Sequence, residues 1–384
     1  MAVSGTLGTT GTFEYDYNDI YELEGVSNAD SHSYAYDNVG NRTTVDSVSY
    51  TTNELNEYTQ VGSTSFTYDG NDNLNYDGTN SYTYDEANRL ISASNSSHSA
   101  TYKYDAFNRR ISKTVDSVTT YYVYDANEVI EENNSSNVLQ ADYVMGSRID
   151  EPLTMTRSST TYYYLTDGLG SVRQLTNSSG TIVESYDYDP YGQVTIYNSS
   201  LTDITSSGSG IDNPYMFTGR RLDEETSVYH YRARQYDPAI GRFLQRDPLG
   251  YYDSMNLYEY GMSNPINWID PFGLECWVSD DDSIRYYDDD GYPVYEPYKE
   301  SKDNGKNDKD DGPVEEYDTF EDAVGKYGDD TLDVEDKLAT KQPKWKKWGY
   351  TEKWIGRDKY GQTCSVFYNP KKKKFSGGGS SSRK

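Results

Sequence analysis

The chain has 384 residues, a formal net charge of −28 and a mean hydropathy of −0.92, and only 34% of its residues are hydrophobic. A chain this acidic repels nucleic acid and anionic membrane surfaces, which argues against both as partners of the whole chain. The charge is unevenly distributed: it is roughly −23 for residues 1–274, roughly −17 for residues 275–336 and roughly +12 for residues 337–384. Only the last segment could therefore bind an anionic partner.

The N-terminus, residues 1–5, has neither the charged region nor the apolar stretch of a signal peptide, and the chain contains no apolar run of 18 residues. We therefore expect no signal peptide and no membrane-spanning segment in the chain as given. The two cysteines, Cys276 and Cys364, form no CxxC pair, so a single bridge and two free thiols are both open. The three histidines are scattered, and we expect no metal site and no cofactor.

Tyrosine supplies 42 positions, and it recurs in a unit that reads Tyr-x-Tyr-Asp-x-x-(Gly/Asn), often followed by Arg. Because Tyr buries a large ring while its hydroxyl can still reach a partner, we expect the chain to pack through its rings. Tyr residues two apart point to one face of a strand, and the Asp can bond its own backbone two residues on and start a turn. Copies occupy residues 34–42, 82–90 and 102–110, with weaker copies at 66–69, 122–125 and 186–189.

Each unit predicts a strand that ends in a turn, and alternating segments such as 114–118 and 180–186 predict a second strand per repeat. The copies at Tyr84, Tyr104 and Tyr124 are spaced by 20 residues. A hairpin of that size cannot bury its rings alone, so stacked neighbours predict a β-sheet that grows in one dimension. The expected fold class is mainly β.

A series of ordered motifs closes the repeat region. They occupy residues 164–173, 188–192, 217–220, 231–238, 241–243 and 270–274, the last reading Asp-Pro-Phe-Gly-Leu. Together with the repeat, they resemble the RHS (rearrangement hotspot) family of YD-repeat proteins. That family includes the C components of insecticidal toxin complexes and the β-shell of teneurins. The resemblance covers about residues 13–274, with repeats over 1–161 and a repeat-associated core over 162–274.

The resemblance implies a hollow β-shell, in which hairpins spiral around a cavity that the repeat-associated core plugs. Such a shell encloses a variable C-terminal polypeptide, often a toxin. The repeats of this chain are far shorter than those of relatives that enclose cargo, and each strand adds less than about 5 Å of width, so we expect a partial shell. Its open edges would pair with another chain, which makes a shell-completing partner, a longer parent protein and a displaced C-terminal cassette alternatives.

The resemblance also implies that the core is an aspartyl protease that cuts its own chain once. The matching positions are Arg234, Asp247 and Asp270, and the scissile bond is Leu274–Glu275. The residue types suit this chemistry. Two carboxylates brought close cannot both ionise, so one polarises the scissile carbonyl while the other activates water. Arg234 could favour the ionised partner or fix its geometry.

Asp-Pro dipeptides also start ordinary turns, and spacing alone favours that use. Four occur here, at Asp189, Asp237, Asp247 and Asp270. One stretch departs from the family: residues 251–255 read Tyr-Tyr-Asp-Ser-Met where relatives continue with small, glycine-rich residues, and this could change the backbone beside Asp247. Because Asp270 stands four residues before the bond, the chain must reverse sharply, and Gly273 permits the φ this requires.

Composition changes abruptly after residue 274. Residues 275–318 predict a solvated, disordered linker, and their triple-Asp runs lack the full ligand pattern of a calcium loop. Residues 319–384 predict a small α+β domain. Helical spacing occurs at 319–327 and 332–338, a β-hairpin is expected at 363–375, and residues 377–382 form a glycine- and serine-rich tail that should be flexible.

The basic residues 337–384 with their interleaved tryptophans would suit an effector directed at nucleic acid. The segment holds no His and no metal cluster, so a nuclease here would depend on Lys353, Arg357, Tyr360 or Ser365. A basic solvated face over a tryptophan core is the simpler interpretation.

The favoured function is a carrier that encloses its own C-terminal domain as cargo and releases it after Leu274 as a toxin in competition between cells. An immunity protein would then be a partner, and the resemblance implies secretion or the cell surface. The alternative is a non-catalytic, tyrosine-rich scaffold for cell-surface or protein contacts. A remnant of a longer gene is a third hypothesis.

Overall fold

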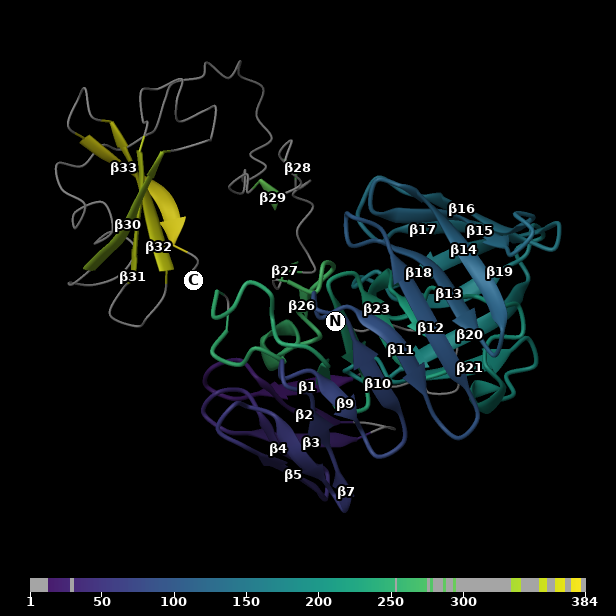
Figure 1. The fold of residues 1–384 in the computed structure, drawn as a ribbon, viewed down its shortest axis with the longest axis horizontal. Helices are drawn as coiled ribbons and strands as arrows, with labels where there is room; N and C mark the ends of the chain where they lie inside the picture. The colour runs from purple at the N-terminus through teal and green to yellow at the C-terminus, as the bar shows by residue number, and fades with distance from the viewer. Residues whose placement is uncertain are drawn as a thin grey trace. The chain divides into compact units, whose positions relative to one another are not determined.

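The computed structural model describes residues 13–27, 31–252 and 254–274, together with short strands between residues 277 and 380. The chain divides into two compact units, Met1–Asp282 and Ser283–Lys384 (Figure 1). Apart from three short 3₁₀ helices, the regular elements of the described residues are β-strands, which confirms the mainly β fold class. Among the described residues, no helix is long and apolar enough to cross a membrane.

The repeat region forms two antiparallel sheets in which each strand pairs with its neighbour in sequence, as a one-dimensional strip requires. The seven-stranded sheet contains β1 (Glu14–Tyr17), β2 (Leu23–Ser27), β3 (His32–Tyr36), β4 (Arg42–Val45), β5 (Val48–Thr52), β6 (Tyr58–Val61) and β7 (Thr64–Ser65). The fourteen-stranded sheet contains β8 (Thr67–Tyr68), β9 (Leu74–Tyr76), β10 (Ser81–Tyr84), β11 (Leu90–Ser94), β12 (Ser99–Tyr104), β13 (Arg110–Val115), β14 (Val118–Asp125), β15 (Glu128–Asn134), β16 (Leu139–Met145), β17 (Pro152–Arg157), β18 (Thr160–Thr166), β19 (Val172–Thr176), β20 (Ile182–Tyr188) and β21 (Val194–Asn198).

The Asp of the repeat unit closes the turn that follows its strand. In the copy at Asp85, Oδ1 accepts hydrogen bonds from the backbone N–H groups of Ala87 (2.9 Å) and Arg89 (3.0 Å). Asn88 takes a φ of 59°, in the left-handed region that Asn tolerates better than most residues. The same pattern recurs at Asp105, so the turns predicted from the repeat are confirmed.

The second Tyr of the unit bonds the preceding strand where the backbone ladder between them has ended. The last pair between β11 and β12 is Ser92 with Thr101, and beyond it the hydroxyl of Tyr104 donates to the carbonyl oxygen of Leu90 at 2.8 Å. One repeat later, Tyr124 donates to the carbonyl of Arg110 at 2.8 Å. The ring is thus buried while its hydroxyl satisfies a backbone acceptor.

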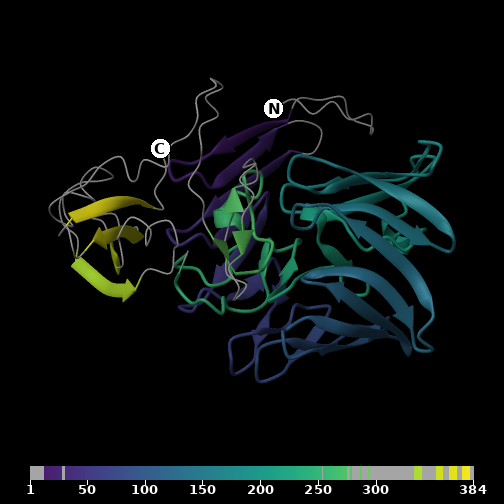
Figure 2. The same cartoon turned by 90° about the horizontal axis from the view of Figure 1, so that it is seen from above.

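Residues 205–274, which we call the core segment, pack against the inner face of the strip. Figures 1 and 2 show the fourteen-stranded sheet curving, with the core segment on its concave side. Backbone bonds join the two, from Leu74 N to Leu244 O (2.8 Å) and from Val172 N to Met216 O (3.0 Å). Its elements are η1 (Thr205–Ser207), η2 (Phe217–Gly219), β22 (Arg221–Asp223), β23 (Val228–Tyr231), β24 (Arg234–Asp237), β25 (Arg242–Phe243), η3 (Gly261–Ser263) and β26 (Trp268–Ile269).

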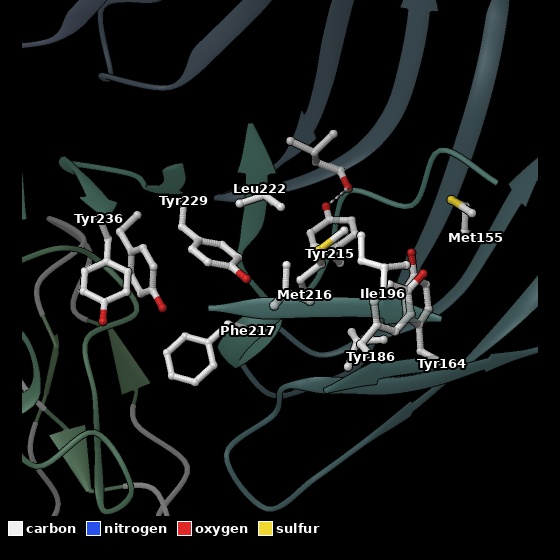
Figure 3. Close-up of a cluster of buried hydrophobic side chains, with 14 of the residues drawn as sticks. Met155, Tyr164, Tyr186, Ile196, Tyr215, Met216, Phe217, Leu222, Tyr229 and Tyr236 are labelled. Carbon is white, nitrogen blue, oxygen red and sulfur yellow. Dashed lines mark hydrogen bonds between the residues drawn. The ribbon is translucent and has the colours of Figure 1, made fainter. Parts of the chain in front are cut away.

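The largest buried cluster lies between the sheet and the core segment, and rings dominate it. Figure 3 shows Tyr229 of the core segment with Phe217 and Tyr236 as its neighbours, and Tyr164 and Tyr186 of the sheet in the same cluster. Every one of these rings is at least nine-tenths buried. The expectation that this chain packs through its tyrosines is therefore confirmed.

Buried ion pairs also connect the strip to the core segment. Arg110 of β13 contacts Asp223 of β22 at 2.6 Å, and Lys113 bonds both Asp223 (3.1 Å) and Glu225 (3.0 Å). Burial alone would raise the pKa of Asp223, but the two cations more than offset it and hold the pKa below its usual value. These pairs span more than a hundred residues of sequence, so they fix how the strip and the core segment dock.

In the second unit the described residues form strands throughout. They are β28 (Tyr286–Tyr287), β29 (Pro293–Val294), β30 (Asp333–Ala339), β31 (Glu352–Arg357), β32 (Thr363–Asn369) and β33 (Lys374–Ser380). The pairing of β32 with β33 confirms the hairpin predicted over 363–375. The helix predicted over 332–338 is wrong, because β30 pairs with β31; the spacing of Val334 and Leu338 also fits strand alternation. Residues 377–380 belong to β33 rather than to a tail, and residues 319–327 lie outside the described residues.

Candidate functional site

The three predicted site residues come from separate parts of the core segment and meet inside it. Arg234 begins β24, Asp247 follows β25, and Asp270 follows β26. The Nη2 atom of Arg234 lies 2.8 Å from Asp247 Oδ2 and 3.1 Å from Asp270 Oδ2, so these two oxygens are no farther apart than the sum of the two distances. All three residues are buried, with exposed fractions of 2% for Arg234, 8% for Asp247 and 0% for Asp270.

Each of the three guanidinium nitrogens of Arg234 contacts an acceptor oxygen. Its Nε donates to the carbonyl oxygen of Gly273 (2.6 Å) and its Nη1 to that of Leu257 (3.1 Å). The ring of Phe243 lies against it, 3.7 Å from the guanidinium carbon to the ring centroid. The Leu257 carbonyl also accepts the backbone N–H of Asp247 (2.9 Å), which ties the Arg and the Asp to one fixed point.

The second oxygen of each carboxylate accepts a backbone N–H. Asp247 Oδ1 accepts from Leu249 (2.7 Å), and Asp270 Oδ1 accepts from Leu274 (2.9 Å). One guanidinium thus faces two carboxylates in a space that excludes water, where a second unbalanced negative charge would be costly. Two buried carboxylates on one guanidinium are groups that acid–base chemistry on a peptide bond could use.

The chain reverses sharply directly after Asp270, as the sequence predicts. Gly273 has a φ of +65°, and its N–H donates to the carbonyl of Asp270 at 3.3 Å. Strand β26 then pairs antiparallel with β27 (Trp277–Val278), in the register Trp268 with Val278 and Ile269 with Trp277. Leu274 therefore lies in the loop between two paired strands, while Glu275 and Cys276 lie outside the described residues.

Two neighbours of Arg234 hold the same turn, and sequence reasoning did not single them out. Arg232 Nη1 donates to the carbonyl of Pro271 (2.5 Å), and Ala233 N–H donates to that of Phe272 (3.1 Å). The guanidinium of Arg232 also lies 4.9 Å from the centroid of the Phe272 ring. The only signal in the sequence was the motif Tyr-Arg-Ala-Arg itself, which places the two arginines two apart in a hairpin turn.

The unusual stretch after Asp247 leaves the turn at that residue intact. Gly250 N–H donates to the carbonyl of Asp247 at 3.0 Å, the usual closure of a tight turn. Beyond it, Tyr251, Tyr252 and Met255 are exposed, by 58%, 67% and 65%. The departure from the family therefore alters the surface next to the site rather than the backbone of Asp247.

The remaining predicted residues lie elsewhere in the fold. Asp189 and Asp237 accept backbone N–H groups two residues on, at 2.9 Å each, as the turn interpretation predicts. In the second unit, Lys353 and Arg357 stand on β31, Ser365 pairs with Ile355 between them, and Tyr360 lies outside the described residues. In the part of the chain that the structure describes, no three His, Cys, Asp or Glu side chains group as metal ligands would.

Comparisons with known proteins give a family and a fold. The sequence model of the teneurin YD-shell family matches residues 3–266. The chain is 30% identical over 141 residues to the double-stranded DNA deaminase toxin A of Burkholderia cenocepacia (strain H111), a match that covers 36% of this chain and 10% of that protein. It is 42% identical over 122 residues to salivary gland surface protein 1 of Aedes aegypti, covering 30% of this chain and 3% of that protein.

Among solved structures, the Tc holotoxin pore of Photorhabdus luminescens aligns with a TM-score of 0.50 over 70% of this chain and 16% of that chain, at 18% identity. An identity this low supports the fold alone. The chain spans a tenth or less of the two relatives named above. These matches bear out the RHS and YD-repeat resemblance.

Proposed function

Because this chain belongs to the teneurin YD-shell family, we propose that residues 1–274 form a shell-type carrier that cuts the chain once, after Leu274. The cut separates residues 275–384, which act as the effector. The family fold, the similarity to a DNA deaminase toxin and the geometry around Arg234 support this function.

The observation that carries the proposal is the contact of one Arg234 nitrogen with both Asp247 and Asp270. Asp270 also holds the backbone N–H of Leu274, and Arg234 holds the carbonyl of Gly273. The residue before the proposed bond is therefore fixed through both sides of its preceding peptide group. Fixed geometry of this kind lowers the barrier of a reaction whose partners are already aligned.

In the proposed reaction one carboxylate takes a proton from water, and the water oxygen attacks the carbonyl carbon of Leu274. The protonated carboxyl donates to the carbonyl oxygen as charge develops there. The intermediate collapses with rupture of the bond to the nitrogen of Glu275, which leaves as an amine after gaining a proton. The products are a carboxylate on Leu274 and an amino group on Glu275.

Enclosure of the effector requires more shell than this strip. The core segment fills the concave face of the fourteen-stranded sheet, and a cavity left beside it measures about 340 Å³, a size typical of small-molecule pockets. Among the described residues, β1 ends the seven-stranded sheet, and an end strand presents backbone groups to a further strand. We propose that a longer parent chain or a second shell component pairs with this end strand and completes the shell.

Mass spectrometry of the full chain after expression tests the cut. We expect two products, residues 1–274 and 275–384, and intact chain from Asp247→Asn and Asp270→Asn, because loss of an acid or base slows such steps by about 10²- to 10⁴-fold. Asp189→Asn is the matched control: it changes another Asp-Pro turn and keeps its acceptor oxygen, so it should cut like the wild type. An intact wild-type chain would refute the proposal.

A non-catalytic scaffold is the second candidate, favoured by the identity to a surface protein of Aedes aegypti. Growth of cells that express the full chain separates the two. The carrier with a toxic effector should inhibit growth when it cuts, and Asp247→Asn should relieve the inhibition while Asp189→Asn should not. Equal growth of all three would favour the scaffold.

A further inference from the structure

Three successive residues at the tip of the β23–β24 hairpin bind three successive carbonyls of the turn before Leu274. Arg232 Nη1 donates to Pro271 O (2.5 Å), Ala233 N–H to Phe272 O (3.1 Å), and Arg234 Nε to Gly273 O (2.6 Å). The turn is thus held in one register against the hairpin tip. A shift by one residue would break all three bonds at once.

Arg232 also binds two carboxylates of the strip. Its two terminal nitrogens contact the two oxygens of Asp150, at 3.0 and 2.8 Å, and Nη2 also contacts Glu128 at 2.8 Å. Glu128 begins β15, and Asp150 lies in the loop between β16 and β17. Paired contacts of a guanidinium with one carboxylate fix orientation as well as charge. Burial raises the pKa of Glu128, and Arg232 opposes that shift.

Two other residues of the core segment, Arg220 and Gly219, also pack closely against Asp150. Arg220 of the core segment also pairs with Asp150. A Cβ atom on Gly219 would lie 2.0 Å from the carbonyl oxygen of Asp150, and Gly219 has a φ of +69°, so this close approach requires glycine. Residues 146–151, which we call the wall loop, therefore meet the core segment at Asp150. Arg232 extends from Asp150 to the turn at Pro271.

We propose that Arg232 is a positioning residue for cleavage, and that it makes the cut depend on docking of Glu128 and Asp150 against the core segment. The inference rests on the proposed self-cleavage. Before Glu128 and Asp150 dock against the core segment, Arg232 lacks these two carboxylate partners and does not hold Pro271. After docking, the turn is locked with Leu274 next to the aspartate pair.

The expected effect of removing Arg232 is large, because a displacement of about 1 Å from the aligned geometry can slow a reaction by about 100-fold. Arg232→Gln should therefore cut about 100-fold more slowly than the wild type. Loss of register should also spread the cut over neighbouring bonds, which the product masses would report. Arg232→Lys should fall between the two, since Lys keeps the charge but not the paired contacts.

The matched control is Arg148→Gln, which removes an exposed Arg that pairs with Glu151 in the same wall loop. It should cut at the wild-type rate and at the same bond. Circular dichroism and urea titration should show that each variant is folded. A mere loss of stability would slow the cut without changing the bond that is cut.

Hydrogen exchange separates failure of this inference from failure of self-cleavage. In the uncut Asp247→Asn chain, adding Arg232→Gln should speed exchange of the amides of Gly273 and Leu274, which both bond Asp270, and adding Arg148→Gln should not. Wild-type cleavage by Arg232→Gln, or unchanged exchange in the double variant, would overturn the role of Arg232. An uncut wild type with faster exchange in the double variant would refute self-cleavage and leave Arg232 as a clamp of a non-catalytic turn.

Discussion

A Cβ atom on Gly273 would lie 2.5 Å from the carbonyl oxygen of Tyr231, closer than real Cβ contacts come. Gly273 also has a φ of +65°, which L side chains rarely adopt. Close packing and backbone conformation thus both require glycine at the turn before Leu274.

Gly273→Ala should therefore displace the turn from Arg234 and slow cleavage by about 100-fold or more, as a misaligned reactant does. A time course of product formation by mass spectrometry measures the effect. Gly168→Ala is the control, because an added Cβ there meets no atom within 4 Å. Cleavage of Gly273→Ala at the wild-type rate would show that the turn does not control the reaction.

Tyr104→Phe tests the hydroxyl contacts of the repeat. It removes the bond to the Leu90 carbonyl, and we expect the free energy of unfolding to fall by about 0.5–1.5 kcal/mol. Urea denaturation measures the change. Tyr121→Phe serves as the control, because Tyr121 is 45% exposed. Equal stability of both variants would mean that the repeated hydroxyl is not structural.

Arg110→Ala should be far more damaging than the same change at its neighbour. Removing Arg110 leaves Asp223 buried with Lys113 as its remaining cation, and breaking a buried pair costs about 3–5 kcal/mol. Arg109→Ala breaks a partly exposed pair with Asp105, for which about 0–1 kcal/mol is usual. Urea unfolding of the two variants should differ accordingly, and similar losses would contradict the assigned roles.

Asp237 should make stability depend on pH. Burial raises its pKa to about 7, with the charge of Asp77 adding to the shift. The folded state then binds a proton that the unfolded state has released above pH 4, so stability falls as pH rises from about 4 to about 7, by about 1.4 kcal/mol per unit.

Asp237→Asn removes this titration. The difference in unfolding free energy between the variant and the wild type should grow from pH 4 to 7 in the variant's favour and then level off. Urea midpoints at four pH values measure it. A difference that stays constant with pH would show that Asp237 does not titrate in that range.

The strip was predictable because its signals are local. The period of 20 residues from Tyr84 to Tyr124 and the Asp that starts each turn specify hairpins without any long-range information. The meeting of Arg234 with two aspartates came from family resemblance, since nothing in the spacing of residues 234, 247 and 270 brings them together. The roles of Arg232 and Asp150 depend on contacts between distant segments, which a local pattern does not contain.

The error at residues 332–338 has a different origin. Val334 and Leu338 are four apart, which suits one face of a helix and, equally, one face of a strand. Short segments of this kind cannot be assigned from periodicity alone. The pairing of β30 with β31 decides the case through a partner that lies beyond the segment itself.

The order of pairing in the two sheets has a consequence for how the molecule is made. Since every strand after the first in each of the two sheets pairs with the strand before it, hairpins can form one after another as the chain emerges during synthesis, with only short loops to close. The contacts of the core segment are the opposite: Arg242 bonds Asn41, 201 residues earlier. The core segment is synthesised last and makes the long-range contacts, which therefore form last. Until residue 274 has left the ribosome, the rings of the strip that the core segment covers stay exposed.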